Sequence, residues 1–205
     1  MREIIKPALS LFVITVVSAF LLGYVFTITE EPIKAAQAAE KNKKLAELFP
    51  EASEFTPNFL LPEFFSEDAE PASAVQLPEG GQQVDGAFIT EALTAKSASG
   101  EIKGYVISAQ SPGYGGVVGI LAAINPDGTV RGISIASSDE TAGLGLNASN
   151  PEFTGQFKGK SGELKVTKVA PSENEIEAIT SATITTSSVT GSVNAALKFF
   201  QSNFS

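Results

Sequence analysis

The stretch "ITSATITTSSVTGSVNAALKFF", residues 179–200, sets the last element of the fold. In its second half apolar residues recur every three or four positions, which predicts an amphipathic helix packed on a core. These residues are Val189, Val193, Leu197 and Phe200. Its first half differs, because nine of the thirteen residues 180–192 are Ser or Thr. Helix capping explains only one or two of them, so the remaining hydroxyls need another role.

The composition of the 205-residue chain narrows the chemistry available to it. The chain has no Cys and no His, which excludes disulfides, thiolate nucleophiles, iron–sulfur ligation, zinc sites of the usual kind and histidine-based triads. The net charge of −9 argues against nucleic acid as a partner, because phosphate binding needs clustered Lys and Arg. Any chemistry must use hydroxyls, carboxylates, backbone amides or a bound cofactor.

The segment "PALSLFVITVVSAFLLGYVFTIT", residues 7–29, contains no charged residue. As a helix it would be about 35 Å long, which is enough to cross a bilayer with some tilt. A cleaved signal peptide is the alternative interpretation. The run is longer than the apolar core of such a peptide, and its end, "FTITEEP" (26–32), offers no small-x-small cleavage site. The sequence therefore favours a retained transmembrane helix.

Basic residues flank this span on both sides, so they do not fix its orientation in the cell membrane. Long domains translocate largely regardless of their charge, and the chain beyond the span is acidic. We expect a single-pass protein with a cytoplasmic stub at residues 1–6 and an extracytoplasmic C-terminal domain.

Three segments follow the span. Residues 30–49 are rich in good helix formers and predict a juxtamembrane helix. Residues 50–85 contain five prolines and are expected to connect the juxtamembrane helix to the domain. The Phe residues among them indicate that part of the segment lies on the domain. From residue 86 the pattern is rich in strands, and residues 86–205 form the expected domain.

Alternating and buried apolar runs within this domain predict strands, and "NPDG" (125–128) has the chemistry of a hairpin turn. Strands followed by a packing helix indicate an α+β fold. The predicted strands are residues 102–109, 117–124, 129–137 and 163–170.

The Ser/Thr run enters the last helix directly, so its hydroxyls gather at the helix N-terminus. Thr185, Thr186 or Ser187 can serve as the N-cap. A helix N-terminus is also a favourable site for a phosphate, because free backbone N–H groups and the helix dipole attract anions. From the residues alone, capping and phosphate binding both remain open.

The segment "AITSATITT" (178–186) resembles the flavinylation motif of FMN-binding domains, Ser/Thr-Gly-Ala-Thr-x-Thr. In that family the final Thr carries FMN through a phosphoester, and here the final Thr is Thr185. The chain departs from the motif at Ser181, where the family prefers Gly. If that position needs a positive φ, Ser is less favourable there than Gly. The other matching residues are Thr180, Ala182 and Thr183.

Three further segments are similar to the family and occur in the family order. "ETAGLG" (140–145) resembles Glu-Thr-Pro-Gly-Leu-Gly, and "PEFTGQFKGK" (151–160) resembles the segment that follows it. "GEIKGYVISAQSPGYGG" (100–116) resembles the entry into Gly-Tyr-Gly-Gly. With the apolar N-terminal span, the chain resembles the FMN-binding G subunits of Rnf-type ion-translocating ferredoxin–NAD oxidoreductases. The C subunits of the sodium-pumping NADH–quinone oxidoreductases are close relatives of that family.

The resemblance implies a function and a site, in which the flavin supplies the chemistry and no metal site and no catalytic acid or base are expected. The chain would be an electron-carrier subunit of a membrane-bound, ion-translocating oxidoreductase, passing electrons through FMN attached covalently to Thr185. Its partners would be the other membrane and peripheral subunits, and a flavin transferase would attach the FMN. In an extended approach to the helix, Thr183 and Thr185 would both point toward the phosphate. The expected cofactor-binding residues are Thr185, Thr183, Ser181, Glu140, Thr141, Gly143, Leu144 and Tyr114.

A second function stays open. The chain could be a membrane-anchored, extracytoplasmic ligand-binding module without a redox role, in which the Ser/Thr run only caps a helix. Visible absorbance that stays with the denatured chain would distinguish the two, because a ligand that is not covalently bound washes out.

Overall fold

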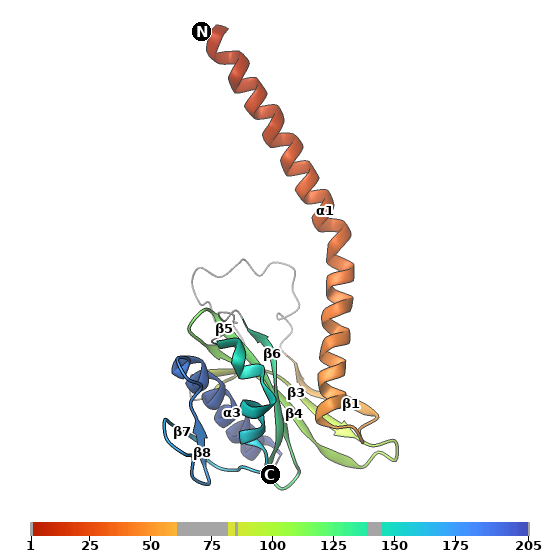
Figure 1. The fold of residues 1–205 in the computed structure, drawn as a ribbon. Coiled ribbons are helices and arrows are strands. Elements are labelled where there is room, and N and C mark those ends of the chain that lie inside the picture. Colours follow the sequence, from red (N-terminus) through yellow and green to blue (C-terminus); the bar gives the residue numbers. More distant parts are fainter. Residues whose placement is uncertain (1, 61–81, 85, 139–144, 205) are drawn as a thin grey trace. The chain divides into compact units, whose positions relative to one another are not determined.

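The computed structural model describes residues 2–60, 82–84, 86–138 and 145–204. By its contacts the chain divides into two compact units, Met1–Lys43 and Lys44–Ser205. Figure 1 shows a long helix and a domain in which helices lie against a sheet, which confirms the predicted α+β class.

Helix α1 runs from Arg2 to Leu48 without interruption. The spanning helix and the juxtamembrane helix expected from the sequence are therefore parts of one helix. Pro32 lies inside it, where proline removes one hydrogen bond of the helical ladder, and Figure 1 shows the helix bending part-way along its length. Every side chain from Leu11 to Thr29 is exposed, and the helix is long and apolar enough to cross a membrane.

The second unit is built on one antiparallel sheet. Its strands lie in the order β1-β3-β4-β5-β6, and β2 pairs with β3 beside β1. A separate pair of short parallel strands, β7 and β8, lies outside this sheet. The strand bounds are Glu54–Leu60 (β1), Gln82–Val84 (β2), Ala87–Lys96 (β3), Ile102–Pro112 (β4), Val117–Ile124 (β5), Val130–Ser138 (β6), Lys165–Thr167 (β7) and Glu175–Glu177 (β8).

The sheet is buried on both faces. Along β5, Ile120 and Ala122 belong to one hydrophobic cluster, whereas Leu121 and Ala123 belong to another. Successive side chains of a strand point to opposite faces, so each cluster covers one face. Double burial explains why β5 is apolar throughout, without the alternation of a half-exposed strand.

Helix α3, Thr183–Asn203, covers the first face. All four residues of its predicted apolar stripe are buried, so the amphipathic helix is confirmed. The second face is covered by Leu45 and Phe49, which come from the last turn of α1 and the residue after it. Between β6 and α3 the described residues also form three short helices, Gly145–Ser149 (η1), Pro151–Thr154 (α2) and Gly155–Phe157 (η2).

The predicted hairpin is confirmed, with β5 and β6 joined through residues 125–128. The predicted strand 163–170 is shorter and covers only Lys165–Thr167. Three strands of the sheet, β1, β2 and β3, were not predicted from the sequence. Strand β1 pairs with β3, and Phe55 packs on the second hydrophobic cluster. The second compact unit therefore includes part of the segment 50–85, which was expected to be a connecting segment.

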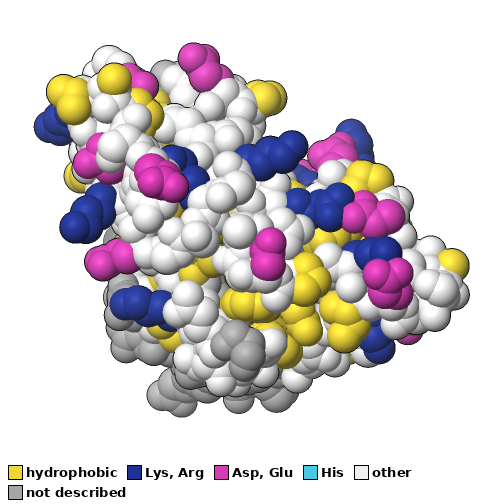
Figure 2. Space-filling model, turned by 90° about the horizontal axis from the view of Figure 1, so that it is seen from below, with side chains coloured by type: hydrophobic (Ala, Val, Ile, Leu, Met, Phe, Trp, Pro, Cys, Tyr) yellow, Lys and Arg dark blue, Asp and Glu magenta, His cyan; other side chains and the backbone are white. Residues whose placement is uncertain are grey.

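The surface of the domain mixes both charges. On the face seen in Figure 2, acidic and basic side chains are interspersed, and hydrophobic side chains are exposed between them. Although the chain has more acidic than basic residues, the acidic side chains do not form a single patch on this face.

Gly104 permits the packing of Phe49 on β4. A Cβ atom at this glycine would lie 2.5 Å from the carbonyl oxygen of Ile124 and 2.6 Å from the Phe49 ring. We expect Gly104→Ala to lower the free energy of unfolding by at least about 2 kcal/mol, because it overpacks a dense core. Urea unfolding of the full chain in detergent measures this. Gly155→Ala is the matched control, since nothing lies within 4 Å of its added Cβ. Equal stability of the two variants would contradict the prediction.

Candidate functional site

The structure gathers part of the predicted site at the start of α3. Thr183 and Thr185 lie in its first turn, and Ser181 lies just before it. Tyr114 lies between β4 and β5, where its side chain is 74% exposed. The other predicted residues, Glu140, Thr141, Gly143 and Leu144, lie outside the described residues.

Ser181 has a φ of 63°. This is the left-handed region, which Gly adopts freely and other residues adopt at a cost of about 1–2 kcal/mol. The position is the one at which the resembling motif prefers Gly. The structure therefore gives a physical reason for that preference, and Ser181 occupies a strained conformation in this chain.

The helix begins earlier than the N-cap prediction allowed. Its N-cap is Ala182, so the prediction of Thr185, Thr186 or Ser187 as the cap was wrong. Among the described residues, no side chain forms a capping hydrogen bond at Ala182. The chain reaches the helix through the turn at Ser181, so a small apolar residue takes the cap position.

Thr186 ties the preceding loop to the helix. The backbone N–H of Ile179 donates to the Thr186 hydroxyl at 3.0 Å, and this hydroxyl donates to the carbonyl of Ala182 at 3.0 Å. Thr186 is fully buried. Its hydroxyl therefore has a structural role that fixes residues 179–182.

A second group of hydroxyls joins α3 to the end of β4. The Ser111 hydroxyl donates to the carbonyl of Ser188 at 2.9 Å, and the Ser192 hydroxyl donates to Ser111 at 2.9 Å. The hydroxyls of Ser111 and Ser188 also share a hydrogen bond. All three residues are buried. Much of the Ser/Thr run thus packs the helix on the sheet, a role that the sequence analysis missed.

Thr185 continues this stripe toward the helix N-terminus. It precedes Ser188 by three residues and Ser192 by seven, so the three lie on one side of the helix. Thr185 is only 1% exposed. Thr183 lies about 200° around the helix axis from Thr185, so the prediction that both hydroxyls point the same way was wrong. The reason is that the helix already begins at Thr183, and the approach is not extended there.

A cavity of about 380 Å³ adjoins the N-terminal half of α3. Four hydroxyl side chains line it, and the start of β3 and the end of β4 close it on the sheet side. Thr183 is part of its lining, whereas Thr185 and Tyr114 are not. The lining residues are Gly86, Ala87, Ser111, Pro112, Thr183, Ile184, Ser187, Ser188 and Gly191.

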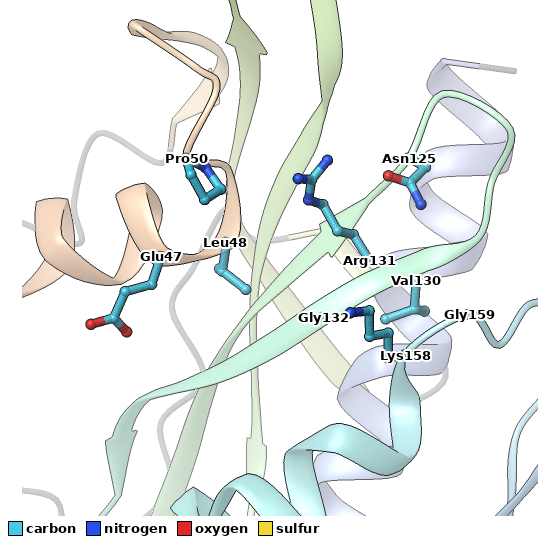
Figure 3. A pocket seen from close by; sticks show the side chains of 9 residues that line it. All are labelled: Glu47, Leu48, Pro50, Asn125, Val130, Arg131, Gly132, Lys158 and Gly159. Atoms are coloured by element: carbon cyan, nitrogen blue, oxygen red, sulfur yellow. The ribbon is translucent and has the colours of Figure 1, made fainter.

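A larger cavity of about 520 Å³ lies elsewhere in the domain (Figure 3) and includes none of the predicted residues. Its most prominent polar group, Arg131, forms an ion pair with Glu51 at 2.6 Å and lies 4.6 Å from the centre of the Phe49 ring. A hydrogen bond from its own backbone N–H lowers the pKa of the Glu51 carboxyl, and Arg131 lowers it further. Arg131 therefore holds the fold together at this cavity.

The start of α3 fits a phosphate. The first helical hydrogen bond runs from the Thr186 N–H to the Ala182 carbonyl at 3.0 Å, so the N–H groups of the three preceding residues are not used within the helix. The first turn contains no acidic residue, and hydroxyls lie beside it. Donors without a competing negative charge are what a phosphate needs at a helix N-terminus.

Residues 113–198 match the FMN-binding domain family. Fold and match together define an FMN-binding domain that follows an apolar helix. Over 207 residues the chain is 34% identical to the G subunit of the Na(+)-translocating ferredoxin:NAD(+) oxidoreductase complex of Acetobacterium woodii, covering 98% of this chain and 93% of that protein. The chain therefore belongs to the family of G subunits of ion-translocating ferredoxin–NAD oxidoreductase complexes, as the resemblance predicted.

Two further similarities extend this comparison. A stretch of 95 residues is 47% identical to the G subunit of the proton-translocating ferredoxin:NAD(+) oxidoreductase complex of Clostridium ljungdahlii, covering 46% of this chain and 51%, about half, of that protein. Among solved structures, the chain is similar to NqrC from Shewanella oneidensis, with a TM-score of 0.48 and 22% identity over 56% of this chain and 58% of that one.

The Ser111 cluster generates a testable prediction. Ser111→Ala leaves the buried hydroxyls of Ser188 and Ser192 without their shared partner, so we expect the free energy of unfolding to fall by about 1–2 kcal/mol. Urea unfolding of the full chain measures it. Ser187→Ala is the control, because Ser187 is exposed on the same helix and should change stability by less than about 0.5 kcal/mol. Indistinguishable variants would show that the cluster does not stabilise the helix on the sheet.

Proposed function

We propose that this chain is an electron-carrier subunit that passes electrons through FMN attached covalently to the hydroxyl of Thr185. The flavin supplies the redox chemistry, and the protein supplies its position and surroundings. The observation that carries the proposal is Ser181, whose φ of 63° meets the backbone requirement that explains Gly in the flavinylation motif. This supports the proposal, because the segment 178–186 combines most of the motif's residue types with a backbone that would favour Gly at position 181.

Most neighbouring hydroxyl groups already form hydrogen bonds within the fold, which supports Thr185 over those residues as the attachment site. Thr186 is hydrogen-bonded to the loop before the helix, and Ser188 and Ser192 are hydrogen-bonded to Ser111. Thr183 and Ser187 are the remaining competitors, because both line the cavity beside α3; the family motif favours Thr185 over both. We propose that Thr183 and Ser181 contact the phosphate, while Glu140, Thr141, Gly143, Leu144 and Tyr114 lie toward the flavin ring.

The attachment site has a direct test. We expect Thr185→Val, expressed with a flavin transferase, to give a folded protein without covalent flavin, because the ester oxygen is missing. Intact mass and peptide mapping measure the adduct, and flavin fluorescence of the denatured chain gives a second readout. Thr183→Val is the matched control and should keep the adduct. Flavin mapped to Thr183 would overturn the assignment, and a chain that never acquires covalent flavin would favour the binding module without a redox role.

We also propose that α1 anchors the chain in the cell membrane, with its N-terminus in the cytoplasm and the FMN-binding domain outside. The support is the charge-free run of residues 7–29, and the acidic balance of the rest of the chain fits an exported domain. The Lys residues that follow the span do not oppose this topology, because long domains translocate largely regardless of their charge.

Protease added to right-side-out vesicles tests this topology. We expect the domain to be digested in intact vesicles, because it lies on the outer side. Inside-out vesicles from the same cells are the control and should protect it. The reverse pattern would place the domain in the cytoplasm.

A further inference from the structure

We propose that the first turn of α3 opens before FMN is attached to Thr185, and that Ser181 favours this opening while Thr186 opposes it. The inference rests on the proposed attachment at Thr185. Its starting point is the burial of Thr185, the residue that would receive the FMN group. A side chain that is 1% exposed cannot contact a flavin nucleotide held by a separate enzyme.

The chemistry of attachment makes this burial decisive. An activated flavin nucleotide such as FAD supplies the FMN group. The Thr185 oxygen forms a bond to the phosphorus of the FMN half, the bond from that phosphorus to the oxygen of the AMP half breaks, AMP leaves and the hydroxyl proton is released. The attacking oxygen must approach within bonding reach of the phosphorus. The folded first turn does not provide that approach.

The first turn of α3 is weak for three independent reasons. Residues 183–186 are all β-branched, and such residues lose side-chain freedom in a helix. Among the described residues, no side chain caps the helix at Ala182. Ser181 stores strain in its positive φ, which is released when the turn opens.

The rest of α3 is held much more firmly. From Ser188 onward the helix is fixed by the Ser111 cluster and by buried apolar residues. The first turn is held by the two hydrogen bonds of Thr186, to Ile179 and Ala182, and by the burial of the short side chains of Thr185 and Thr186. Opening can therefore stop before Ser188, because it breaks the bonds of Thr186 and leaves the packed part of the helix in place.

Two substitutions should change the attachment rate in opposite directions. Thr186→Val keeps the shape of the side chain but removes both hydrogen bonds, so we expect attachment to become about fivefold to tenfold faster. Ser181→Gly releases the strain of the closed turn, so attachment should become about threefold slower. Thr190→Val is the matched control, because the Thr190 hydroxyl is buried but has no partner among the described residues; its rate should stay within about twofold of the unchanged chain.

The experiment uses the full chain in detergent, purified without flavin, with limiting flavin transferase and FAD, and it follows the adduct by intact mass. Hydrogen exchange of the N–H groups of Thr186 and Ser187, the first ones bonded within the helix, should rise in Thr186→Val and fall in Ser181→Gly, while residues 192–200 remain protected in both. A synthetic peptide of residues 175–192 has no folded turn to open, so the same substitutions should leave its rate unchanged. This separates opening from recognition by the transferase.

The outcomes distinguish the two proposals. Equal rates in all full-chain variants, or a faster Ser181→Gly, would overturn the opening while leaving attachment at Thr185 intact. Rate changes that also occur in the peptide would assign the effect to recognition and overturn the opening as well. No adduct on Thr185 in either the chain or the peptide would overturn the proposed function itself.

Discussion

The seating of α3 on the end of β4 is the interaction on which the candidate site depends. Ser111 accepts from Ser192, donates to the backbone of Ser188, and is buried with both. These hydrogen bonds fix the rotation of the helix about its axis more strictly than apolar contacts alone would. Rotation decides which hydroxyl of the first turn faces the sheet, so the cluster determines the different surroundings of Thr183 and Thr185.

The sheet beneath the helix is rigid because both of its faces are covered. Phe49 lies against β4 where Gly104 leaves room for its ring, and Arg131 lies over that ring while it is paired with Glu51. The residues that follow α1, Phe49 and Glu51, are thus part of the packed domain and not of a flexible linker. A site built on packed elements is held more precisely than one built on loops alone.

The sequence allowed prediction of the elements whose pattern is local. The apolar stripe of α3 and the β5–β6 hairpin follow from periodicity and turn chemistry, and the motif places Ser181 where a positive φ is needed. Strand β3 was missed because it is buried on both faces and contains Glu91 and two threonines, so it does not alternate. The role of the serines could not be foreseen, because their partner Ser111 lies 77 residues from Ser188 in the chain.

Covalent attachment would change what the protein must provide. A ligand held without a covalent bond needs a deep, mostly apolar pocket to supply binding energy, whereas Thr185 lies outside the lining of the cavity of about 380 Å³ beside α3. A phosphoester on Thr185 would keep the flavin from dissociating, so the protein would not need a deep pocket to retain it. The surroundings then need only to orient the ring and set its potential. A chain without His or Cys is suited to that role, since none of its side chains has to take part in the redox step.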